Sequence, residues 1–295
     1  MKISIIVPTY NNLSYLKLFI KSIEENSKYL NEVIVHINDG SDGTLDYVKN
    51  KNIKFTHSKN NIGLCSSVNL ATKLSSNDLI VYAHDDMFFC KNWDYELLHE
   101  IKTMKSNLYY ISGMNISYLD GFINHDCGNT VDNFDRKKFE VFCETNVPIN
   151  YQGSHWAPHI VHKNLWNAVG GFSEEFNPGD GSDPDFCFKL WKKNVRIFKT
   201  FGKWKVYHFG SVTTRKKKYL KINKGTKKFI LKWKMRPRTF RTHYLRGEKK
   251  IEYKEPLDDP KLSMLYIKDI FIDRLKYIYF KLINKFKKFN EYLLH

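Results

Sequence analysis

The amino-acid sequence predicts an α/β protein with a mostly parallel central sheet and helices on both of its faces. Within the first ninety residues, short runs of β-branched and apolar side chains alternate four times with stretches whose apolar residues recur at helical spacing. This alternation is typical of a doubly wound sheet, in which a helix connects each strand to the next. Polar residues follow each expected strand, at the end of the sheet where such folds bind their ligands.

The first third of the chain supplies four of the expected strands. The run at residues 2–7 is apolar almost throughout, as expected of a strand that is buried on both faces, and we expect it to stop at Pro8. The other elements expected before residue 105 are a helix at 16–23, strands at 32–37 and 53–56, a helix at 68–74, a strand at 79–83 and a helix at 93–104.

After residue 105 the pattern is less regular. Clusters of Gly, Asn and Asp separate short aromatic runs over residues 119–147, which we expect to be irregular. Gly170 ends a short helix, as glycine commonly does just beyond a helix C-terminus. The elements expected in this part are a strand at 109–116, helices at 165–169 and 186–191, and a strand at 203–207.

Composition excludes several classes of protein. The five cysteines are odd in number and contain no C-x-x-C pair, so neither a disulfide framework nor a zinc site is expected, and a reducing, cytoplasmic location is favoured. No stretch reaches the roughly 18 uncharged apolar residues that a membrane span needs. Met1-Lys2 leads directly into the first strand, so we expect no signal peptide.

The C-terminal part of the chain carries most of the net charge of +17. Residues 211–250 contain sixteen Lys or Arg and a single acid, Glu248. Such a segment suits nucleic acid, anionic lipid or an acidic polysaccharide, or it forms a solvated charged face. Apolar residues at spacings of three and four, interrupted by charges, continue over residues 262–295. We expect helix there that lies on an anionic membrane surface, packs on the protein or pairs with a second copy.

The strand at residues 79–83 ends in the sequence His84-Asp85-Asp86. Two adjacent acids at the carboxyl end of a buried strand are better explained by the binding of a cation or a polar ligand than by a role in folding. No G-x-G-x-x-G follows the first strand, and no G-x-x-x-x-G-K-[ST] occurs in the chain. The common nicotinamide and P-loop sites are therefore not supported.

Four motifs resemble, in the same order, the nucleotide-sugar half of family 2 glycosyltransferases of the GT-A fold. They are Ile6-Val7-Pro8-Thr9-Tyr10-Asn11, Asn38-Asp39-Gly40-Ser41, Asn61-x-Gly63 and His84-Asp85-Asp86. The resemblance continues in Val169-Gly170-Gly171-Phe172, Asp183-Pro184-Asp185-Phe186 and Val206-Tyr207-His208-Phe209. It implies a catalytic domain at residues 1–215, with a nucleotide-sugar half to about 105 and a mixed-strand acceptor half at 106–215. Residues 216–295 then form a basic, largely helical extension.

The resemblance also implies roles for individual residues. Asp86 and His208 are the expected ligands of Mn²⁺ or Mg²⁺, while a role for His84 is left open between ligand contact and packing. Asp183 is the expected base, with Asp185 as the alternate base, an acceptor contact or a helix cap; Ser182 stands where the family has an acid. His155 and Trp156 are candidates for the acceptor site, and Trp156 could equally be a core residue. The expected nucleotide-sugar contacts are Pro8, Thr9, Tyr10, Asn11, Asp39, Asn61, Gly63 and Asp85.

The function implied is metal-dependent, inverting transfer of a sugar from a UDP- or dTDP-linked donor to a hydroxyl of a glycan or glycolipid, in surface polysaccharide synthesis. One alternative, a sugar-phosphate nucleotidyltransferase, needs a Gly-rich loop with Lys or Arg after the first strand, and Thr9-Tyr10-Asn11-Asn12 is not one. The other, a nucleic-acid-binding protein that uses the basic segment, leaves the acidic strand ends unexplained.

Overall fold

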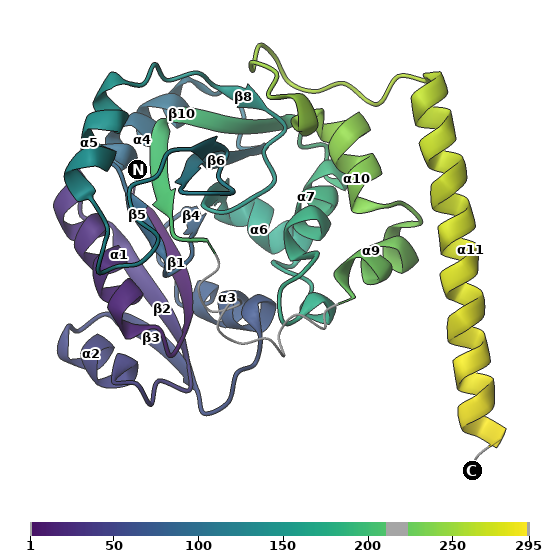
Figure 1. Cartoon of the computed structure of the whole chain (residues 1–295), viewed down its shortest axis with the longest axis horizontal. Coiled ribbons are helices and arrows are strands. Elements are labelled where there is room, and N and C mark those ends of the chain that lie inside the picture. Colours follow the sequence, from purple (N-terminus) through teal and green to yellow (C-terminus); the bar gives the residue numbers. More distant parts are fainter. Residues whose placement is uncertain (1, 211–223, 294–295) are drawn as a thin grey trace.

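A computed structural model describes residues 2–210 and 224–293 of the chain. A ten-stranded sheet forms its centre, with the strand order β3-β2-β1-β4-β9-β6-β10-β5, and helices flank both faces (Figure 1). In addition, β7 pairs with β6 and β8 pairs with β10. The strands are β1 (Ile3–Tyr10), β2 (Glu32–Asn38), β3 (Lys54–Ser58), β4 (Leu79–Tyr82), β5 (Met87–Phe89), β6 (Tyr109–Ser117), β7 (Ile123–Asn124), β8 (Tyr151–Gln152), β9 (His159–His162) and β10 (Ile197–His208).

The α-helices connect and cover these strands. They are α1 (Leu13–Asn26), α2 (Thr44–Asn50), α3 (Leu64–Thr72), α4 (Trp93–Thr103), α5 (Arg136–Thr145), α6 (Lys163–Val169), α7 (Ser182–Lys192), α9 (Gly225–Trp233), α10 (Pro237–Thr239) and α11 (Met264–Leu293). Two 3₁₀ turns, η1 (Glu174–Phe176) and η4 (Gly247–Lys249), and a π-helical segment, η3 (Phe240–Leu245), complete the described elements.

The predicted fold class, a mostly parallel sheet that becomes mixed, is confirmed. β1, β2, β3 and β4 run parallel to one another, as the alternating pattern of the first third indicates. The second half is mixed, because β9 runs antiparallel to both β4 and β6, and β5 runs antiparallel to β10. The short strands β5, β7, β8 and β9 were not predicted, since two to four residues carry too little periodicity to be recognised.

The prediction that Pro8 ends the first strand is wrong. β1 continues through Pro8 to Tyr10, and Pro8 lies opposite His36 in the parallel pair with β2. On its other edge, β1 pairs with β4 only as far as Ile6. Backbone groups two residues apart point to the same edge of a strand, so Pro8 faces the edge where β4 has ended. The N–H that proline lacks is not needed there.

A helix occupies part of the stretch that we expected to be irregular, so that expectation is wrong for α5. The Asp135 carboxylate accepts a hydrogen bond from the Lys138 backbone N–H at 2.9 Å and so caps the helix. Phe139 anchors the helix in the core with no exposed surface. Charged residues on both sides of Phe139 weaken the helical pattern in the sequence, and the burial that stabilises α5 comes from distant elements.

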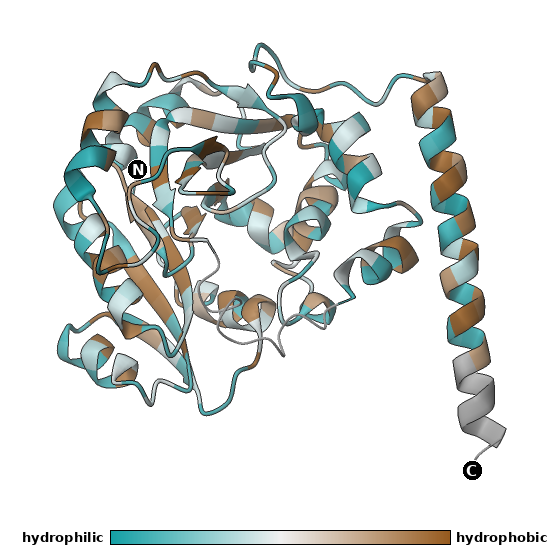
Figure 2. Ribbon diagram, in the orientation of Figure 1, coloured by the Kyte–Doolittle hydropathy of each residue, from teal (hydrophilic) through white to brown (hydrophobic). Residues whose placement is uncertain are grey.

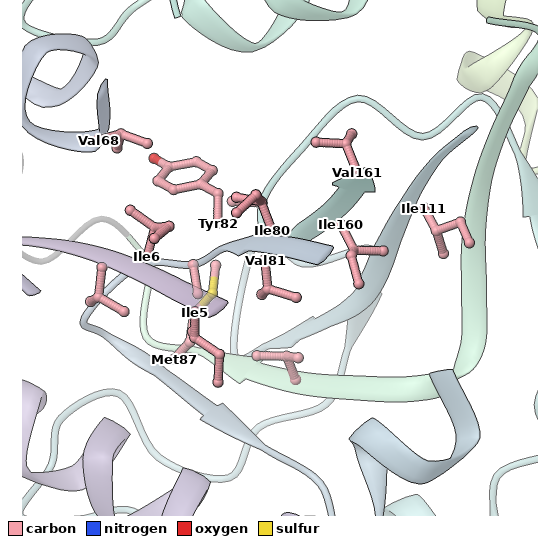
Figure 3. Packing of buried hydrophobic residues seen from close by; sticks show 14 of the residues in the cluster. Ile5, Ile6, Val68, Ile80, Val81, Tyr82, Met87, Ile111, Ile160 and Val161 are labelled. Atoms are coloured by element: carbon pink, nitrogen blue, oxygen red, sulfur yellow. The ribbon is translucent and has the colours of Figure 1, made fainter. Parts of the chain in front are cut away.

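The strand β4 crosses the core, and its side chains alternate between the two faces of the sheet. Tyr82 lies on the same side as Val68 of α3, whereas Val81 and Met87 lie on the opposite side (Figure 3). Each of these four residues is at most 1% exposed. The acids that follow β4 are therefore held by a closely packed element.

The C-terminal extension contributes to the same core. Phe229 of α9 and Phe240 of η3 are fully buried, and the Trp233 ring lies 4.8 Å from that of Phe188 on α7. α11 stands beside α9 and α10 at one side of the molecule (Figure 1). The domain boundary predicted near residue 215 falls outside the described residues, as do residues 211–223 of the basic segment. None of the described helices is sufficiently long and apolar to cross a membrane.

Candidate active site

The predicted nucleotide-sugar residues gather at the carboxyl ends of β1, β2 and β4. Thr9 lies near the end of β1, Asp39 follows β2, and Asp85 follows β4. β1 is the central strand of the three, and the chain passes from it first to β2 on one side and later to β4 on the other. This change of direction creates the crevice in which open α/β sheets bind their ligands.

Asp85 is tied to β1 across this crevice. The Thr9 hydroxyl donates a hydrogen bond of 2.6 Å to Asp85 Oδ2. Burial and the adjacent charge of Asp86 raise the pKa of Asp85 to about 7, although the Thr9 hydrogen bond opposes the rise. The Asp85 side chain is thus fixed in position beside Thr9.

Asn11 and Asp39 hold each other in place at the ends of β1 and β2. The Asn11 side-chain amide donates to Asp39 Oδ2 at 2.8 Å, and its carbonyl oxygen accepts from the Gly40 N–H at 2.8 Å. The Ser41 N–H donates to Asp39 Oδ1 at 3.2 Å. Both Asn11 and Asp39 have positive φ, a conformation that Asn and Asp adopt more readily than most residues. The predicted pair therefore forms one fixed unit.

Asn61 and Gly63 lie in the loop between β3 and α3, where their visible roles are in shaping the backbone. The Asn61 carbonyl oxygen accepts from the Gly63 N–H at 2.9 Å. Gly63 has φ of +84°, and a Cβ there would meet the Asn177 side chain at 2.5 Å. Asn177 in turn accepts from the Cys65 N–H at 2.9 Å and so caps α3. A direct contact of Asn61 or Gly63 with donor remains a prediction.

Three side chains form a cluster of metal-ligand type after β4 and β10. Asp86 Oδ1 lies 3.2 Å from His208 Nε2 and 4.0 Å from His84 Nδ1, and the two imidazole nitrogens are 3.4 Å apart. The ligand atoms all lie within 4.8 Å of one another. β5 and β10 set this geometry by pairing Met87 with His208, and the Phe209 N–H donates to the Asp86 carbonyl at 3.1 Å.

The surroundings of His84 keep its Nδ1 atom available as a metal ligand. His84 Nε2 lies 3.0 Å from the Tyr82 hydroxyl. With its hydrogen donated there, Nδ1 presents a lone pair toward Asp86 and His208. Burial and the neighbouring His208 lower the pKa of His84 to about 4, so that its ring is neutral at pH 7. Burial lowers the pKa of His208 too, but the Asp86 carboxylate outweighs that effect and raises it above its usual value.

These donors fit a divalent cation. Two imidazoles and a carboxylate are a ligand set that transition-metal ions commonly accept. Asp86 and His208, the predicted ligands, are in contact, and His84, whose role the sequence left open, completes the set. The signal for His84 in the sequence was its position two residues before Asp86, the predicted metal ligand.

Asp183 lies in the first turn of α7. Its Oδ1 atom is inaccessible to solvent and finds no hydrogen-bond partner among the described residues. Burial raises the pKa of Asp183 to about 7. After burial, the charge of Asp183 is the largest cause of the raised pKa of Tyr82, the residue that contacts His84. Asp183 therefore shares one electrostatic neighbourhood with the metal-ligand cluster.

Asp185 has a different environment. It is fully buried and accepts hydrogen bonds from the Ser173 hydroxyl at 2.6 Å and the Trp233 indole at 2.7 Å, while Lys232 Nζ lies 2.9 Å from Oδ1. Two of these three partners come from α9, so Asp185 joins α7 to the C-terminal extension. Because both its oxygens are engaged, the geometry does not favour Asp185 as the alternate base or as an acceptor contact.

His155 and Trp156, the predicted acceptor residues, are partly buried near the middle of β6. The Trp156 indole donates to the Gly113 carbonyl at 3.1 Å, and its ring lies 5.4 Å from that of Phe122. His155 Nδ1 lies 3.1 Å from the Gly153 carbonyl, and burial lowers the His155 pKa to about 4. Among the described residues, no hydrogen bond, ion pair or ring contact joins His155 or Trp156 to the cluster of His84, Asp86 and His208. Their acceptor role therefore remains a prediction.

The sequence profile described as Glycosyl transferase family 2 matches residues 4–156, just over half of the chain. The chain belongs to this family. A protein named as an uncharacterized glycosyltransferase, from Rickettsia bellii (strain RML369-C), is 33% identical over 124 residues, which make up 40% of this chain and 17% of that protein. The chain therefore spans a small part of the length of this curated relative.

Solved structures show that the chain has the predicted GT-A fold. Residues 1–349 of S. aureus TarS align at 20% identity and a TM-score of 0.53, over 70% of this chain and 60% of that chain. GalNAc-T7, solved with UDP, GalNAc and Mn²⁺, aligns at 14% identity and a TM-score of 0.55, over 70% of this chain and 44% of that chain. The TarS fragment in complex with UDP-GlcNAc aligns at 18% identity and a TM-score of 0.52, over 72% and 61% of the two chains.

We expect Asp185→Asn to destabilise the protein. Lys232 keeps its ion pair with Glu175 at 2.7 Å, but the substitution removes a buried carboxylate that accepts from Ser173 and Trp233, and leaving such buried donors poorly matched typically costs about 1–3 kcal/mol of unfolding free energy. Urea unfolding measures the effect. Asp259 makes a surface ion pair with Arg196 and is 77% exposed, so Asp259→Asn is the control, with an expected change below about 1 kcal/mol. Equal stability of the two variants would contradict the structural role of Asp185.

A cavity of about 530 Å³ lies away from this site, between α1, α4, α5 and β10. Its lining carries four cations and four glutamates, and two of the cations are in ion pairs: Arg136 pairs with Glu25 and Glu140, and Lys203 pairs with Glu96 at 2.9 Å. With its charges neutralised internally, this cavity is a poor binding place for a diphosphate.

Proposed function

We propose that this glycosyltransferase is metal-dependent and inverting, and that it transfers a sugar from a UDP- or dTDP-linked donor to a hydroxyl of a glycan or glycolipid in surface polysaccharide synthesis. The observation that carries the proposal is the cluster of His84, Asp86 and His208 at the carboxyl edge of the sheet, together with the carboxyl group of Asp183, whose pKa is raised and whose buried Oδ1 has no hydrogen-bond partner among the described residues. Sugar transfer needs positive charge to stabilise the departing diphosphate and a base to remove the proton of the acceptor hydroxyl. A cation site and a nearby carboxylate can supply both.

The donor would lie across the ends of β1, β2 and β4. In this proposal the Asp39 carboxylate accepts the ring N–H of uracil or thymine, and Asp85 lies beside the ribose. The complexes of TarS with UDP-GlcNAc and of GalNAc-T7 with UDP support a donor of this class, because both share the fold. The proposed donor site also includes the residues at the end of β1, which are Pro8, Thr9, Tyr10 and Asn11.

The ligand set favours Mn²⁺ over Mg²⁺. Mg²⁺ prefers oxygen ligands and retains its water, whereas a set with two imidazoles suits a transition-metal ion better. The bound ion supplies positive charge that stabilises the departing diphosphate. His84, Asp86 and His208 would hold the ion, and the Tyr82 hydroxyl, 3.0 Å from His84 Nε2, would keep the His84 ring in its orientation.

Asp183 is the proposed base. An acceptor hydroxyl must lose its proton as it attacks the anomeric carbon, and a carboxylate whose pKa is near 7 accepts a proton more readily than an ordinary aspartate does. A single displacement by that hydroxyl inverts the configuration at the anomeric carbon. The proton ends on Asp183, and the nucleoside diphosphate leaves.

Product analysis tests the proposed function. The protein is incubated with Mn²⁺, a panel of UDP- and dTDP-sugars, and either oligosaccharides or lipid-linked sugars, and the release of nucleoside diphosphate is measured. We expect acceptor-stimulated release from at least one donor. Release of pyrophosphate from a nucleoside triphosphate and a sugar 1-phosphate, with no reaction of any nucleotide sugar, would instead identify a nucleotidyltransferase.

We expect the rate of transfer to rise with pH through about 7. Asp183 must be ionised to act as a base, and burial raises its pKa to about 7, so the active form increases as the pH rises through that value. The measurement is kcat/KM for the acceptor between pH 5.5 and 9 at saturating Mn²⁺ and donor. A rate that falls over this range, or that does not change below pH 7, would exclude Asp183 as the titrating base.

A further inference from the structure

The long helix α11 presents its apolar residues to solvent. Hydrophobic side chains recur along the helix at spacings of three and four, and hydrophobic positions alternate with polar ones along its ribbon (Figure 2). Each of the following is at least half exposed: Met264 (83%), Ile267 (50%), Phe271 (64%), Leu275 (52%), Ile278 (52%), Leu282 (50%) and Phe286 (66%). We call this set the outer stripe of α11. An exposed apolar stripe of this length usually marks a binding surface.

The opposite face of α11 is held to the protein by polar contacts. Arg236 bonds to both Asp269, at 2.6 Å, and Asp273. His243 Nε2 lies 2.8 Å from Asp269 Oδ2, and the hydroxyls of Tyr244 and Tyr266 lie 2.9 Å apart. These contacts fix the rotation of the helix. Turning the outer stripe inward would break them and leave buried charges without partners, which is strongly unfavourable.

The same rotation of α11 places its acidic and basic side chains on different faces of the helix. Over residues 264–286, both acids of the helix, Asp269 and Asp273, face inward toward Arg236. The exposed cations beside the outer stripe are Lys268, Arg274, Lys276, Lys281 and Lys285. The outward surface of this part of α11 is therefore an apolar stripe flanked by positive charge, with no acid.

We propose that the outer stripe docks this protein on an anionic membrane surface, with α11 lying in the plane of the interface. Apolar side chains enter the boundary of the acyl chains, and the flanking Lys and Arg side chains pair with lipid phosphates. The positive charges beside the outer stripe favour lipid over a second copy of the chain as the binding partner. Two copies meeting at this face would bring their cations together with no acid to neutralise them.

This docking is independent of the proposed function, because it rests on α11 alone. α11 extends about 45 Å at 1.5 Å per residue, which is long enough to orient the whole molecule on a surface. If both proposals hold, the active site works next to the membrane, and an acceptor carried on a lipid is favoured over a free glycan.

Vesicle sedimentation of the full-length protein tests the proposal without any need for activity. The vesicles consist of phosphatidylcholine alone, or of phosphatidylcholine with one quarter phosphatidylglycerol. We expect the protein to pellet with the anionic vesicles and to remain in solution with the neutral ones. The variant Phe271→Ser/Leu275→Ser/Ile278→Ser removes the centre of the outer stripe and should lower the bound fraction at least tenfold.

A matched variant controls for general loss of apolar surface. Leu30→Ser/Val141→Ser/Val147→Ser alters three residues that are 93%, 50% and 72% exposed and lie far from α11 in the sequence, and it should bind as the wild type does. The variant Lys276→Gln/Lys281→Gln/Lys285→Gln keeps the stripe and removes three cations. We expect it to lose binding to anionic vesicles and to gain none to neutral ones.

Three outcomes overturn the proposal. The first is wild-type protein that stays in solution with anionic vesicles. The second is equal pelleting of the wild type and the outer-stripe variant, which assigns binding to another part of the chain. The third is a wild-type dimer that the outer-stripe variant converts to a monomer while neither protein binds vesicles, which makes a second copy the occupant of the stripe.

Discussion

Replacing Asp183 with asparagine is expected to abolish sugar transfer while leaving donor binding nearly unchanged. A base acts on the acceptor hydroxyl, and its removal typically lowers a rate by about 10²- to 10⁴-fold. Because the proposed donor site uses Asp39, Asp85 and Asp86 and not Asp183, the affinity for the donor should not change. The measurements are kcat for transfer and the dissociation constant of UDP in the presence of Mn²⁺. Transfer within tenfold of the wild-type rate would contradict the assignment of the base.

The same substitution should also make the protein more stable at neutral pH. Burial raises the pKa of Asp183 from 3.8 to about 7, so the folded state favours the protonated acid more than the unfolded state does. Ionised Asp183 therefore destabilises the fold, by an amount that grows from about pH 4 to pH 7 and then levels off. Asp183→Asn removes this cost, and we expect Tm to rise by a few degrees at pH 8 and by less at pH 5. Asp185→Asn, two residues away, should instead lower Tm.

Replacing Asp86 with alanine is expected to eliminate high-affinity metal binding. Asp86 is the only carboxylate of the described three-residue cluster, and it lies between two imidazoles, so its loss removes both a ligand and the negative charge of the site. Titration of free Mn²⁺, followed by its electron paramagnetic resonance signal, measures the affinity. The control is Asp46→Ala, which removes an exposed acid on α2. Unchanged Mn²⁺ affinity in the Asp86 variant would place the metal elsewhere.

Much of the donor half is predictable from the sequence because its signals are local. The buried run at residues 79–82 and the acids after it lie side by side in the chain, and parallel strands bring their carboxyl ends to one edge of a sheet. The contacts of Thr9 with Asp85 and of Asn11 with Asp39 follow from that arrangement.

Other features depend on partners that are distant in the sequence. His84 becomes a candidate ligand only because β5 and β10 pair and bring His208 to it across 124 positions. Asp185 is distinguished from Asp183 by Ser173 and by two residues of α9, which no local pattern links to it. Likewise, the spacing of apolar residues in α11 predicts a stripe but not its direction. The partners of Asp269 and Asp273 decide that direction.

We propose that His84, Asp86 and His208 hold a cation through which a nucleoside diphosphate binds. Isothermal titration of the protein with UDP, once with Mn²⁺ and once with EDTA, tests this most directly. We predict saturable binding of UDP with Mn²⁺, weaker binding when Mg²⁺ replaces it, and no measurable binding with EDTA. Binding of UDP with the same affinity in EDTA as in Mn²⁺ would contradict the claim.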